Sequence, residues 1–432
     1  MTSLLAVLVL ASHAYAAFGI PAADATGKKL RWRQGSIQIA VSTSLTRQNP
    51  NIKYDTDVAG ALRRSIQTWR KIVDLELVEA TSEKQGISPA GPRGDGVSLI
   101  TIAQTAENVL FFSNGLEDSA AATRVFFDKR GFVTEADIAL NPFQQFSTDG
   151  TVGTFDLEST LTHEIGHLLG LEHSSVLGAT MHARYGKNGA YGLSNFSART
   201  LSQGDITEAQ RLYGSMNESV ACCAGIGGKL TTADGKTREW QVWAEDPVTG
   251  QVRADAATAN DGTFRFDGLS RGSYSLYAQD RSGVFAALHG DVGEVVAGIE
   301  EPAVVNKKLL AGKGEFRLDF LGFNGQLSDI AIALNRGKSY TIYLGGKNLD
   351  PARLTVGFNS KFLSIVPDTI RSLDFGSDVS VISFELRVDR KTPAGDYSVF
   401  VASEDGVKRY IVGGLTIEEF ANPWSKFNVD SN

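Results

Sequence analysis

The segment HEIGHLLGLEHS, from His163 to Ser174, constrains this 432-residue chain more than any other feature. On an α-helix, residues four apart share a face, so His163 and His167 can point their rings at one ion. Gly170 can adopt a left-handed conformation that ends the helix, which lets the chain bring His173 back towards the same ion. Three neutral imidazoles leave the fourth tetrahedral position of zinc open, and an open position is typical of a catalytic site.

Glu164 follows the first of these histidines and is the candidate general base. Its side chain would project to the side on which a zinc-bound water sits. Zinc lowers the pKa of such a water to about 7, which makes it a usable nucleophile at neutral pH. The shorter motif His-Glu-x-x-His arises by accident in some chains, whereas Gly170 and His173 at fixed offsets make coincidence rare. The sequence therefore predicts one catalytic Zn²⁺ ion, held by His163, His167 and His173.

The motif is predicted to lie on an amphipathic helix. Either Asp156 or Thr154 can cap the start of this helix. An apolar stripe repeats at helical spacing through Leu157, Leu161, Ile165 and Leu168. Because the histidines lie roughly opposite that stripe, the helix would bury one face in a core and present the other to a cleft.

These residues resemble the matrixin-like branch of the metzincin metallopeptidases, in which serine follows the zinc motif directly, as Ser174 does here. The sequence Gly-Ala-Thr-Met at 178–181 is similar to the Met-turn of that family. The resemblance implies that Met181 places its thioether beneath the zinc as a hydrophobic floor. A methionine that only fills a gap in the core is the alternative.

A second match lies further along the chain, at Leu201–Gly214, which is similar to the last helix of matrixin catalytic domains. Ser202 is the predicted N-terminal cap of this helix, and Gly214 its C-terminal stop. The resemblance implies that Asp205 supports the Met-turn from below. A plain capping role for this carboxylate remains open, and the two roles are compatible.

The order of elements upstream agrees with the resemblance, which covers about residues 30–214. Apolar spacing predicts a first strand within Trp32–Leu45 and an amphipathic helix within Asp55–Leu75. Further strand-like runs are Val97–Ile102, Val109–Ser113, Thr123–Phe127 and Ala136–Asn141. The resemblance implies a twisted sheet with a long backing helix. It also implies that an edge strand, placed near Ala120–Val125, pairs with the substrate backbone.

Several departures limit what the resemblance carries over. No histidine lies between the signal region and His163, so a second, structural zinc lacks its ligands, and no cysteine precedes the domain to block the zinc. Gly204 stands where animal matrixins hold the freed amino terminus with an acidic residue. Tyr185 lies four residues after Met181, not two, so the tyrosine ligand of the astacin branch does not carry over, and we expect a surface tyrosine. The segment from Met181 to Leu201 is long, so the preference for the substrate side chain after the cut cannot be transferred.

After Gly214 the pattern changes to short strands and glycine-rich turns, as in β-sandwiches. Residues 225–312 resemble a transthyretin-like, carboxypeptidase-regulatory-like sandwich, and residues 314–420 an immunoglobulin-like sandwich. The expected fold class is therefore multi-domain: an α+β metzincin domain at 30–214, two all-β sandwiches, and a tail at 421–432. The sandwiches are expected either to space the enzyme or bind a surface or matrix ligand, or only to stabilise the chain.

Composition narrows the partners and the location. A net charge of −7 argues against nucleic acid and anionic membrane surfaces. The apolar run Leu4–Leu10 is too short to span a bilayer and Ala14–Ala16 resembles a signal-peptidase site, so residues 1–16 are expected to be a signal peptide. We expect no membrane span and a secreted, extracellular or periplasmic protein. The adjacent Cys222 and Cys223 cannot form a disulfide framework, and we assign them no catalytic role.

The sequence thus predicts a secreted zinc endopeptidase that acts on proteins or peptides. A non-catalytic surface or adhesion protein, whose sandwiches carry the binding, is the alternative from another class. The intact ligands and base argue against it. A zinc hydrolase acting on a non-peptide bond is a third reading. Asp118, Asp128 and Asp137 are candidate Ca²⁺ ligands, although isolated surface aspartates are commoner. The natural substrate, the cleavage preference and the oligomeric state remain open.

Overall fold

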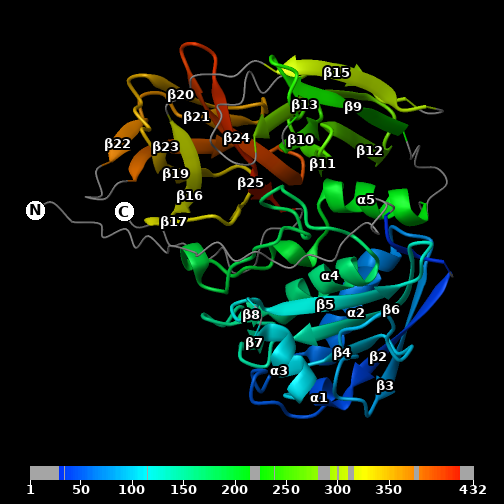
Figure 1. Cartoon of the computed structure of the whole chain (residues 1–432). Coiled ribbons are helices and arrows are strands. Elements are labelled where there is room, and N and C mark those ends of the chain that lie inside the picture. Colours follow the sequence, from blue (N-terminus) through cyan, green and yellow to red (C-terminus); the bar gives the residue numbers. More distant parts are fainter. Residues whose placement is uncertain are drawn as a thin grey trace, which may run out of the picture.

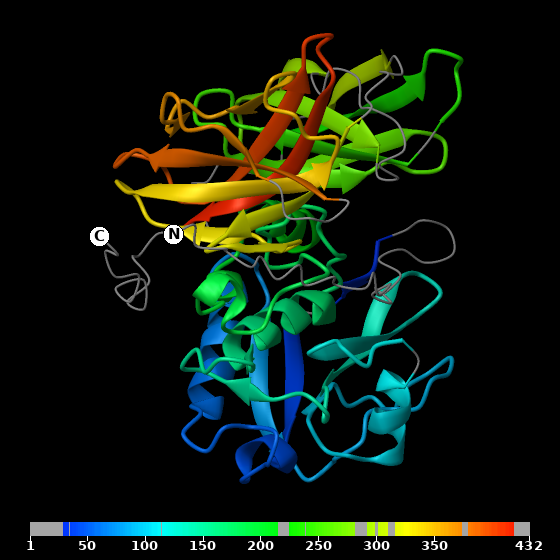
Figure 2. The same cartoon turned by 90° about the vertical axis from the view of Figure 1, so that its left-hand side faces the viewer.

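The computed structural model describes residues 29–33, 35–113, 115–214, 224–237, 239–280, 292–298, 301–309, 316–373 and 379–418. A mixed α/β domain lies below two all-β domains in Figure 1, and the view from the side in Figure 2 shows the same division. The expected signal peptide at 1–16, the pair Cys222 and Cys223, and the tail at 421–432 lie outside the described residues.

A six-stranded sheet forms the frame of the first domain, in the order β1-β6-β4-β2-β3 with β5 on the free side of β6. Only β5 runs antiparallel to its neighbour. Since β6 is the one strand with which β5 pairs in the described part of the chain, β5 is an edge strand, as predicted for Ala120–Val125. The strands are β1 (Arg31–Trp32), β2 (Ser36–Ser42), β3 (Glu76–Ser82), β4 (Leu99–Thr101), β5 (Ala121–Phe127) and β6 (Phe132–Leu140).

Two helices pack against each other over this sheet, α2 (Val58–Arg70) and α4 (Leu157–Leu168). The indole nitrogen of Trp69 donates a hydrogen bond of 2.8 Å to the carbonyl oxygen of Thr162, and Ser65 donates one of 3.0 Å to Glu158. These bonds fix the position of α4 relative to α2. The remaining elements are α1 (Thr43–Thr46), α3 (Ala106–Phe112), α5 (Gln203–Tyr213), β7 (Phe146–Ser147), β8 (Phe155–Asp156), η1 (Ala190–Gly192) and η2 (Ser197–Arg199).

The strand predicted at Val109–Ser113 is wrong, because this run belongs to helix α3. Thr105 caps the helix by accepting a hydrogen bond from the backbone N–H of Asn108. Asn108 and Phe112, four residues apart, are buried, while Leu110 between them is 57% exposed. A short apolar run fits a strand or a helix equally well, and here the polar cap decides.

Two β-sandwiches follow, as predicted. In the first, the sheet β11-β10-β13-β14 packs on the sheet β12-β9-β15, with a core that includes Trp240, Phe264 and Leu276. Its strands are β9 (Ala224–Thr232), β10 (Trp240–Glu245), β11 (Val252–Ala257), β12 (Thr263–Leu269), β13 (Ser273–Asp280), β14 (Gly293–Val296) and β15 (Ala303–Leu309).

In the second sandwich, the sheet β17-β16-β19-β23-β21, with β22 also on β23, packs on the sheet β18-β25-β24-β20. Its strands are β16 (Arg317–Phe323), β17 (Gln326–Ser328), β18 (Ile332–Leu334), β19 (Ser339–Lys347), β20 (Leu354–Phe358), β21 (Leu363–Ile365), β22 (Arg371–Leu373), β23 (Ser380–Val388), β24 (Gly395–Ser403) and β25 (Lys408–Ile417).

All three domains share a small apolar core where they meet. Val176, from the loop after the zinc motif, packs with Trp243 of the first sandwich and with Tyr410 and Val412 of the second. The backbone N–H of Leu177 also donates to the carbonyl oxygen of Val412 at 2.9 Å. Helix α5 lies against β11 and β12, directly beneath the first sandwich in Figure 1. The sandwiches are therefore packed on the first domain and hold the loop that follows the zinc motif.

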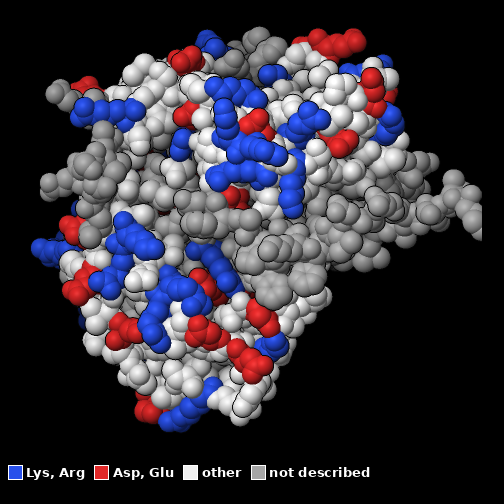
Figure 3. All heavy atoms as spheres, turned by 180° about the vertical axis from the view of Figure 1, so that it is seen from behind, with Lys and Arg blue, Asp and Glu red and all other residues white. Residues whose placement is uncertain are grey.

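The net charge of the chain is −7. Figure 3 shows the face opposite to that of Figure 1, on which acidic and basic side chains are interspersed over both the upper and the lower half. Within the described ranges, none of the helices has the length and apolar character needed to cross a bilayer.

Candidate active site

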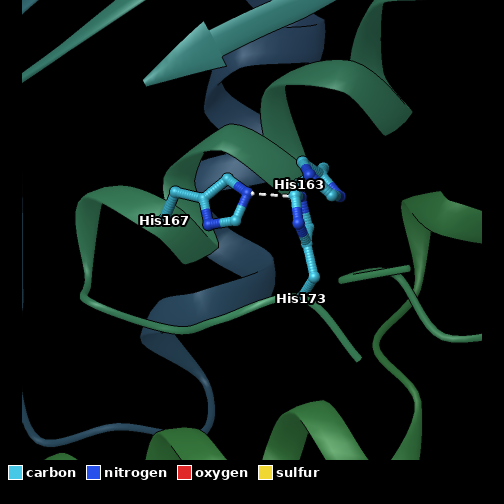
Figure 4. Close-up of side chains that lie close together, drawn as sticks. All are labelled: His163, His167 and His173. Atoms are coloured by element: carbon cyan, nitrogen blue, oxygen red, sulfur yellow. Dashed lines mark hydrogen bonds between the residues drawn. The ribbon is translucent and has the colours of Figure 1, made fainter. Parts of the chain in front are cut away.

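The structure brings His163, His167 and His173 together at one point (Figure 4). The first two come from α4 and the third from the loop after it. One nitrogen from each ring lies within 4.8 Å of the others, and the Nε2 atoms of His167 and His173 are 3.0 Å apart. In the part of the chain that the structure describes, this is the one group of three or more histidine, cysteine, aspartate or glutamate side chains that could hold a metal ion.

Both ends of α4 follow from local sequence. Asp156, not Thr154, is the cap, since its carboxylate accepts a 2.9 Å hydrogen bond from the backbone N–H of Ser159. At the other end Gly170 has φ +93°, and its N–H donates to the carbonyl oxygen of His167 at 2.8 Å. A Cβ at Gly170 would lie 2.5 Å from the carbonyl oxygen of Leu30. The turn that returns His173 to the site thus requires glycine both for its backbone angle and for its space.

Backbone carbonyl groups orient the first two histidine rings. The Nδ1 atom of His163 lies 2.7 Å from the carbonyl oxygen of Thr180, and that of His167 lies 2.9 Å from the carbonyl oxygen of Leu171. Because a carbonyl oxygen only accepts, each Nδ1 carries the proton and each Nε2 keeps its lone pair for the centre of the triad. Burial lowers the pKa of His163 to about 3 and that of His167 to about 4, so both rings are neutral at pH 7. Three neutral imidazoles are the donor set that Zn²⁺ accepts.

Glu164 is buried next to the triad, with a side chain that is 2% exposed, and lines the same cavity. Its Oε2 atom accepts a hydrogen bond of 2.5 Å from the hydroxyl of Thr123 on the edge strand β5. Burial raises the pKa of Glu164 to about 7, while the bond from Thr123 acts in the opposite direction. Sequence reasoning missed Thr123, because only the folded sheet brings β5 to this helix.

Met181 lies in a tight turn beneath α4 and is 1% exposed. Its thioether fills the space in which a Cβ at Gly166 would stand, on the helical turn between the two helix histidines. Asp205 accepts hydrogen bonds from the backbone N–H groups of Thr180, at 2.9 Å, and Met181, at 3.3 Å. The same carboxylate completes a capping box with Ser202. Asp205 therefore caps α5 and supports the turn, the two roles that the sequence left open.

Tyr185 is not the surface tyrosine that we expected. Its ring centroid lies 5.3 Å from that of His163, and it packs edge-on against Phe155. It lines the cavity, forms a hydrogen bond with Thr160, and its pKa is raised by burial. The spacing of four residues from Met181 shows only that Tyr185 does not correspond to the tyrosine ligand of the astacin branch. It does not indicate that the chain turns back and places Tyr185 beside the triad.

The triad and Glu164 open into a cavity of about 790 Å³. One wall is the edge strand β5 with the residues before it, and the opposite wall is the segment after the tight turn. The second sandwich forms a third part of the cavity lining, although the sequence predicted it to be a separate domain. The residues from that sandwich are Gln326, Ser328, Asp329 and Ile330.

The three aspartates considered as Ca²⁺ ligands are not brought together, since the triad is the one such group among the described residues. Asp137 is fully buried and accepts hydrogen bonds from the backbone N–H groups of Ser88 and Leu99, at 2.7 and 2.9 Å. Burial raises its pKa to about 7. Asp128 accepts from two N–H groups in the turn between β5 and β6. Asp118 lines the cavity.

The comparisons with known proteins concern the first domain. Residues 31–214 match the family model of the matrixins. This segment is a matrixin domain. Part of the chain is similar to metalloendoproteinase 1 of Glycine max, with 27% identity over 194 residues, which is 43% of this chain and 53% of that protein. Human (Homo sapiens) matrilysin is 40% identical over 179 residues, 41% of this chain and 56% of the relative. The chain thus spans about half the length of the curated relatives it matches.

The solved structures that match this chain resemble it only weakly. One is the Bacteroides ovatus protein SGBP-B in complex with a mixed-linkage heptasaccharide, 12% identical, with a TM-score of 0.17 and coverage of 44% of this chain and 43% of that one. Another is the BIgI domain of beta protein from S. agalactiae, 11% identical, with a TM-score of 0.14 and coverage of 21% and 91%. Values this low carry no argument, so the sandwich assignment rests on the strand order and the cores.

Proposed function

We propose that this protein is a secreted zinc-dependent endopeptidase. The observation that carries the proposal is the convergence of three imidazole nitrogens beside a buried carboxylate, in a cavity bordered by β5, which is an edge strand among the described residues. When bound, the zinc ion acidifies a water molecule and polarises the carbonyl group of the bond to be cut. The matrixin match over residues 31–214 supports this chemistry. The proposed function is that of the whole chain, whereas the family match covers residues 31–214.

We assign the ligands to His163, His167 and His173 and the general base to Glu164. The carbonyl oxygens of Thr180 and Leu171 hold the first two rings with Nε2 directed inward. Glu164 takes a proton from the attacking water and passes it to the leaving amine. A carboxyl group whose pKa is raised by burial suits both steps, since it accepts and releases a proton near neutral pH.

Two side chains support this machinery without touching the reacting atoms. Thr123 directs Oε2 of Glu164 through its hydroxyl group. Met181 lies below the turn of α4 that carries both helix ligands, where its apolar side chain keeps water away from the backs of the rings. We assign it the role of a supporting floor.

The proposed substrates are proteins or peptides in an extended conformation. The outer edge of β5 presents backbone N–H and C=O groups beside the triad, so a substrate strand can pair with it and lie across the cavity. The expected signal peptide at 1–16 and the matrixin match support secretion. The proposed domain division is 30–214, 225–312 and 314–420. The three large apolar clusters, one centred on each unit, support it, and Tyr191 of the first unit packs into the cluster of the second sandwich.

The test uses the full chain. Purified protein should contain one zinc ion and should cleave an unstructured protein such as casein. Chelation should abolish cleavage and added zinc should restore it. Glu164→Gln should keep the ion and lose hydrolysis, whereas His167→Ala should lose both. A protein that binds zinc but leaves casein intact would instead be the non-catalytic surface or adhesion protein, with the sandwiches carrying the binding.

A further inference from the structure

The second sandwich contributes part of the wall of the catalytic cavity. Gln326 and Ser328 belong to strand β17, and Asp329 and Ile330 follow in the connection to β18. These residues share the cavity with the histidine triad and Glu164. A substrate side chain next to the bond being cut would therefore meet this sandwich as well as the matrixin domain.

One buried tyrosine fixes the cavity wall to the sandwich. Tyr191, in the segment after the tight turn, is 2% exposed and is part of the core of the second sandwich. Its hydroxyl donates to the carbonyl oxygens of Leu321, at 2.9 Å, and Ile330, at 3.1 Å. Its backbone N–H donates to Gln326, and its carbonyl oxygen accepts from the side chain of Asn324 at 2.8 Å. The wall and the sandwich are thus one packed unit.

Two closer contacts join them at the cavity itself. A Cβ at Gly186 would lie 2.7 Å from Cδ1 of Ile330, so this glycine allows the sandwich to approach the wall. Arg184 of the matrixin domain forms an ion pair with Asp329 of the sandwich. The side chains of Arg184 and Asp329 are 38% and 20% exposed, and both line the cavity.

The ion pair between Arg184 and Asp329 determines how much free charge the cavity presents to a substrate. The other lining residues that carry a charge are Asp118, Glu164 and Lys187. With the pair intact, Arg184 and Asp329 cancel each other, and neither offers a free charge to a substrate. Loss of one partner would leave the other facing the cavity, where an exposed charge interaction contributes up to about 1 kcal/mol.

We propose that the second sandwich determines substrate specificity, and that Asp329 keeps the cavity from selecting acidic side chains by neutralising Arg184. This inference rests on the proposed function. It gives the sandwich a positioning and selecting role within the cleft, in place of a spacer or a separate binding module. The substrate class is a peptide with an uncharged side chain next to the bond being cut.

The experiment compares internally quenched peptides that differ only in one residue adjacent to the cut, which is Leu, Glu or Lys. Asp329→Asn frees Arg184, so the ratio of kcat/KM for the Glu peptide over the Leu peptide should rise about fivefold. Arg184→Met frees Asp329 and should raise the Lys over Leu ratio by a similar factor. The double variant should return both ratios to within about twofold of the unmodified protein, because both charges are then gone.

A matched control comes from the same sandwich. Arg317 and Asp319 form a comparable ion pair at 2.8 Å, with side chains 58% and 27% exposed, away from the cavity-lining residues. Asp319→Asn makes the same charge change and should leave both ratios unaltered. Ser328→Lys leaves Arg184 and Asp329 in place, removes the hydrogen bond between Ser328 and Tyr191, and adds a positive charge to the same wall. It should also favour the Glu peptide, even if Asp329→Asn does not fold.

The possible outcomes separate this inference from the function on which it rests. If the unmodified protein cleaves no peptide, the proposed function fails. If it cleaves, but the single variants and Ser328→Lys keep the original ratios, the second sandwich does not select substrates and the inference is wrong. A uniform loss of kcat/KM on every peptide would likewise overturn it, because that result indicates a structural role alone.

Discussion

The carboxylate of Asp255, in the first sandwich, accepts a hydrogen bond of 2.8 Å from the hydroxyl of Ser174, the residue directly after the third histidine. The same carboxylate accepts two bonds from Ser175, from its N–H at 2.8 Å and from its hydroxyl at 2.7 Å. A Cβ at Gly204 would lie 3.4 Å from Oδ1 of Asp255, so the sandwich carboxylate lies beside the start of α5, where Gly204 stands. The first sandwich thus holds the loop that presents His173.

Replacing Asp255 by alanine should weaken zinc binding without touching a ligand. The change removes the acceptor of the Ser174 and Ser175 donors, which are half-buried, and this costs about 0.5–1.5 kcal/mol per bond and loosens the loop of His173. We expect at least a tenfold lower zinc affinity in a chelator competition assay, together with a lower urea midpoint. Asp261→Ala, at an exposed turn of the same sandwich, serves as control and should change neither value. Unaltered zinc affinity in Asp255→Ala would refute this role.

Thr123→Val should reduce turnover while the zinc content stays at one ion per chain. Valine keeps the shape of the side chain but cannot donate to Oε2 of Glu164, so the carboxylate loses the bond that aims it. Outer-shell hydrogen-bond partners in metal sites typically contribute about 10- to 100-fold to activity. Thr123→Ser keeps a hydroxyl group and should recover most of the loss. Equal kcat values for the valine and serine variants would show that the hydroxyl of Thr123 does not orient the Glu164 carboxylate.

The sequence predicted the zinc helix well because its determinants are local. The histidine spacing, the capping carboxylate of Asp156 and the glycine at 170 all lie between residues 156 and 173, and the structure contains each of them. Tyr185 and Asp329 lie in the cavity because distant segments fold together, and neither has a neighbour in sequence that indicates it. The helix at Ala106–Phe112 was missed for a different reason, since its apolar run is too short to have a clear period.

Tyr191 should couple the stability of the second sandwich to that of the matrixin domain. Tyr191→Ala removes a large side chain from the sandwich core and should lower the free energy of unfolding by about 3–5 kcal/mol. Tyr191→Phe loses the hydrogen bonds of the hydroxyl with the carbonyl oxygens of Leu321 and Ile330 and with the side chain of Ser328, and should cost about 1–3 kcal/mol. Hydrogen exchange should show faster exchange around residues 182–190 as well as in β17 for the alanine variant. Faster exchange in only one of the two segments would argue against a shared unit.

Gly170→Ala should disrupt the site through a steric clash. The added Cβ would meet the carbonyl oxygen of Leu30 at 2.5 Å, in addition to the strain at φ +93°. Gly153→Ala is a matched control, because Gly153 has φ +84° but nothing within 4 Å of its Cβ position. The control carries only the backbone strain, about 1 kcal/mol. We expect a several-fold larger loss of zinc affinity for Gly170→Ala, measured by chelator competition, and equal losses would show that the clash does not matter.

Asp396 should make the protein less stable as the pH rises from about 4 to about 7. Its carboxyl is buried where the second sandwich meets the loop of Gly178, and burial raises its pKa to about 7 from an ordinary value of 3.8. The buried carboxylates Asp205 and Asp255 act in the same direction, while the hydroxyl of Thr416 donates to it at 2.8 Å and opposes them. Because the folded state binds this proton more tightly than the unfolded chain, its contribution is complete below about pH 4 and is lost as the pH rises towards 7.

Asp396→Asn removes that ionisation while the amide oxygen still accepts from Thr416. Urea unfolding of the zinc-loaded chain at pH 5 and pH 8 should show a smaller fall in stability for the variant than for the unmodified protein. The variant should also be more stable at pH 8, by more than about 1 kcal/mol. A pH dependence that is the same with and without Asp396 would show that this carboxyl does not titrate on unfolding.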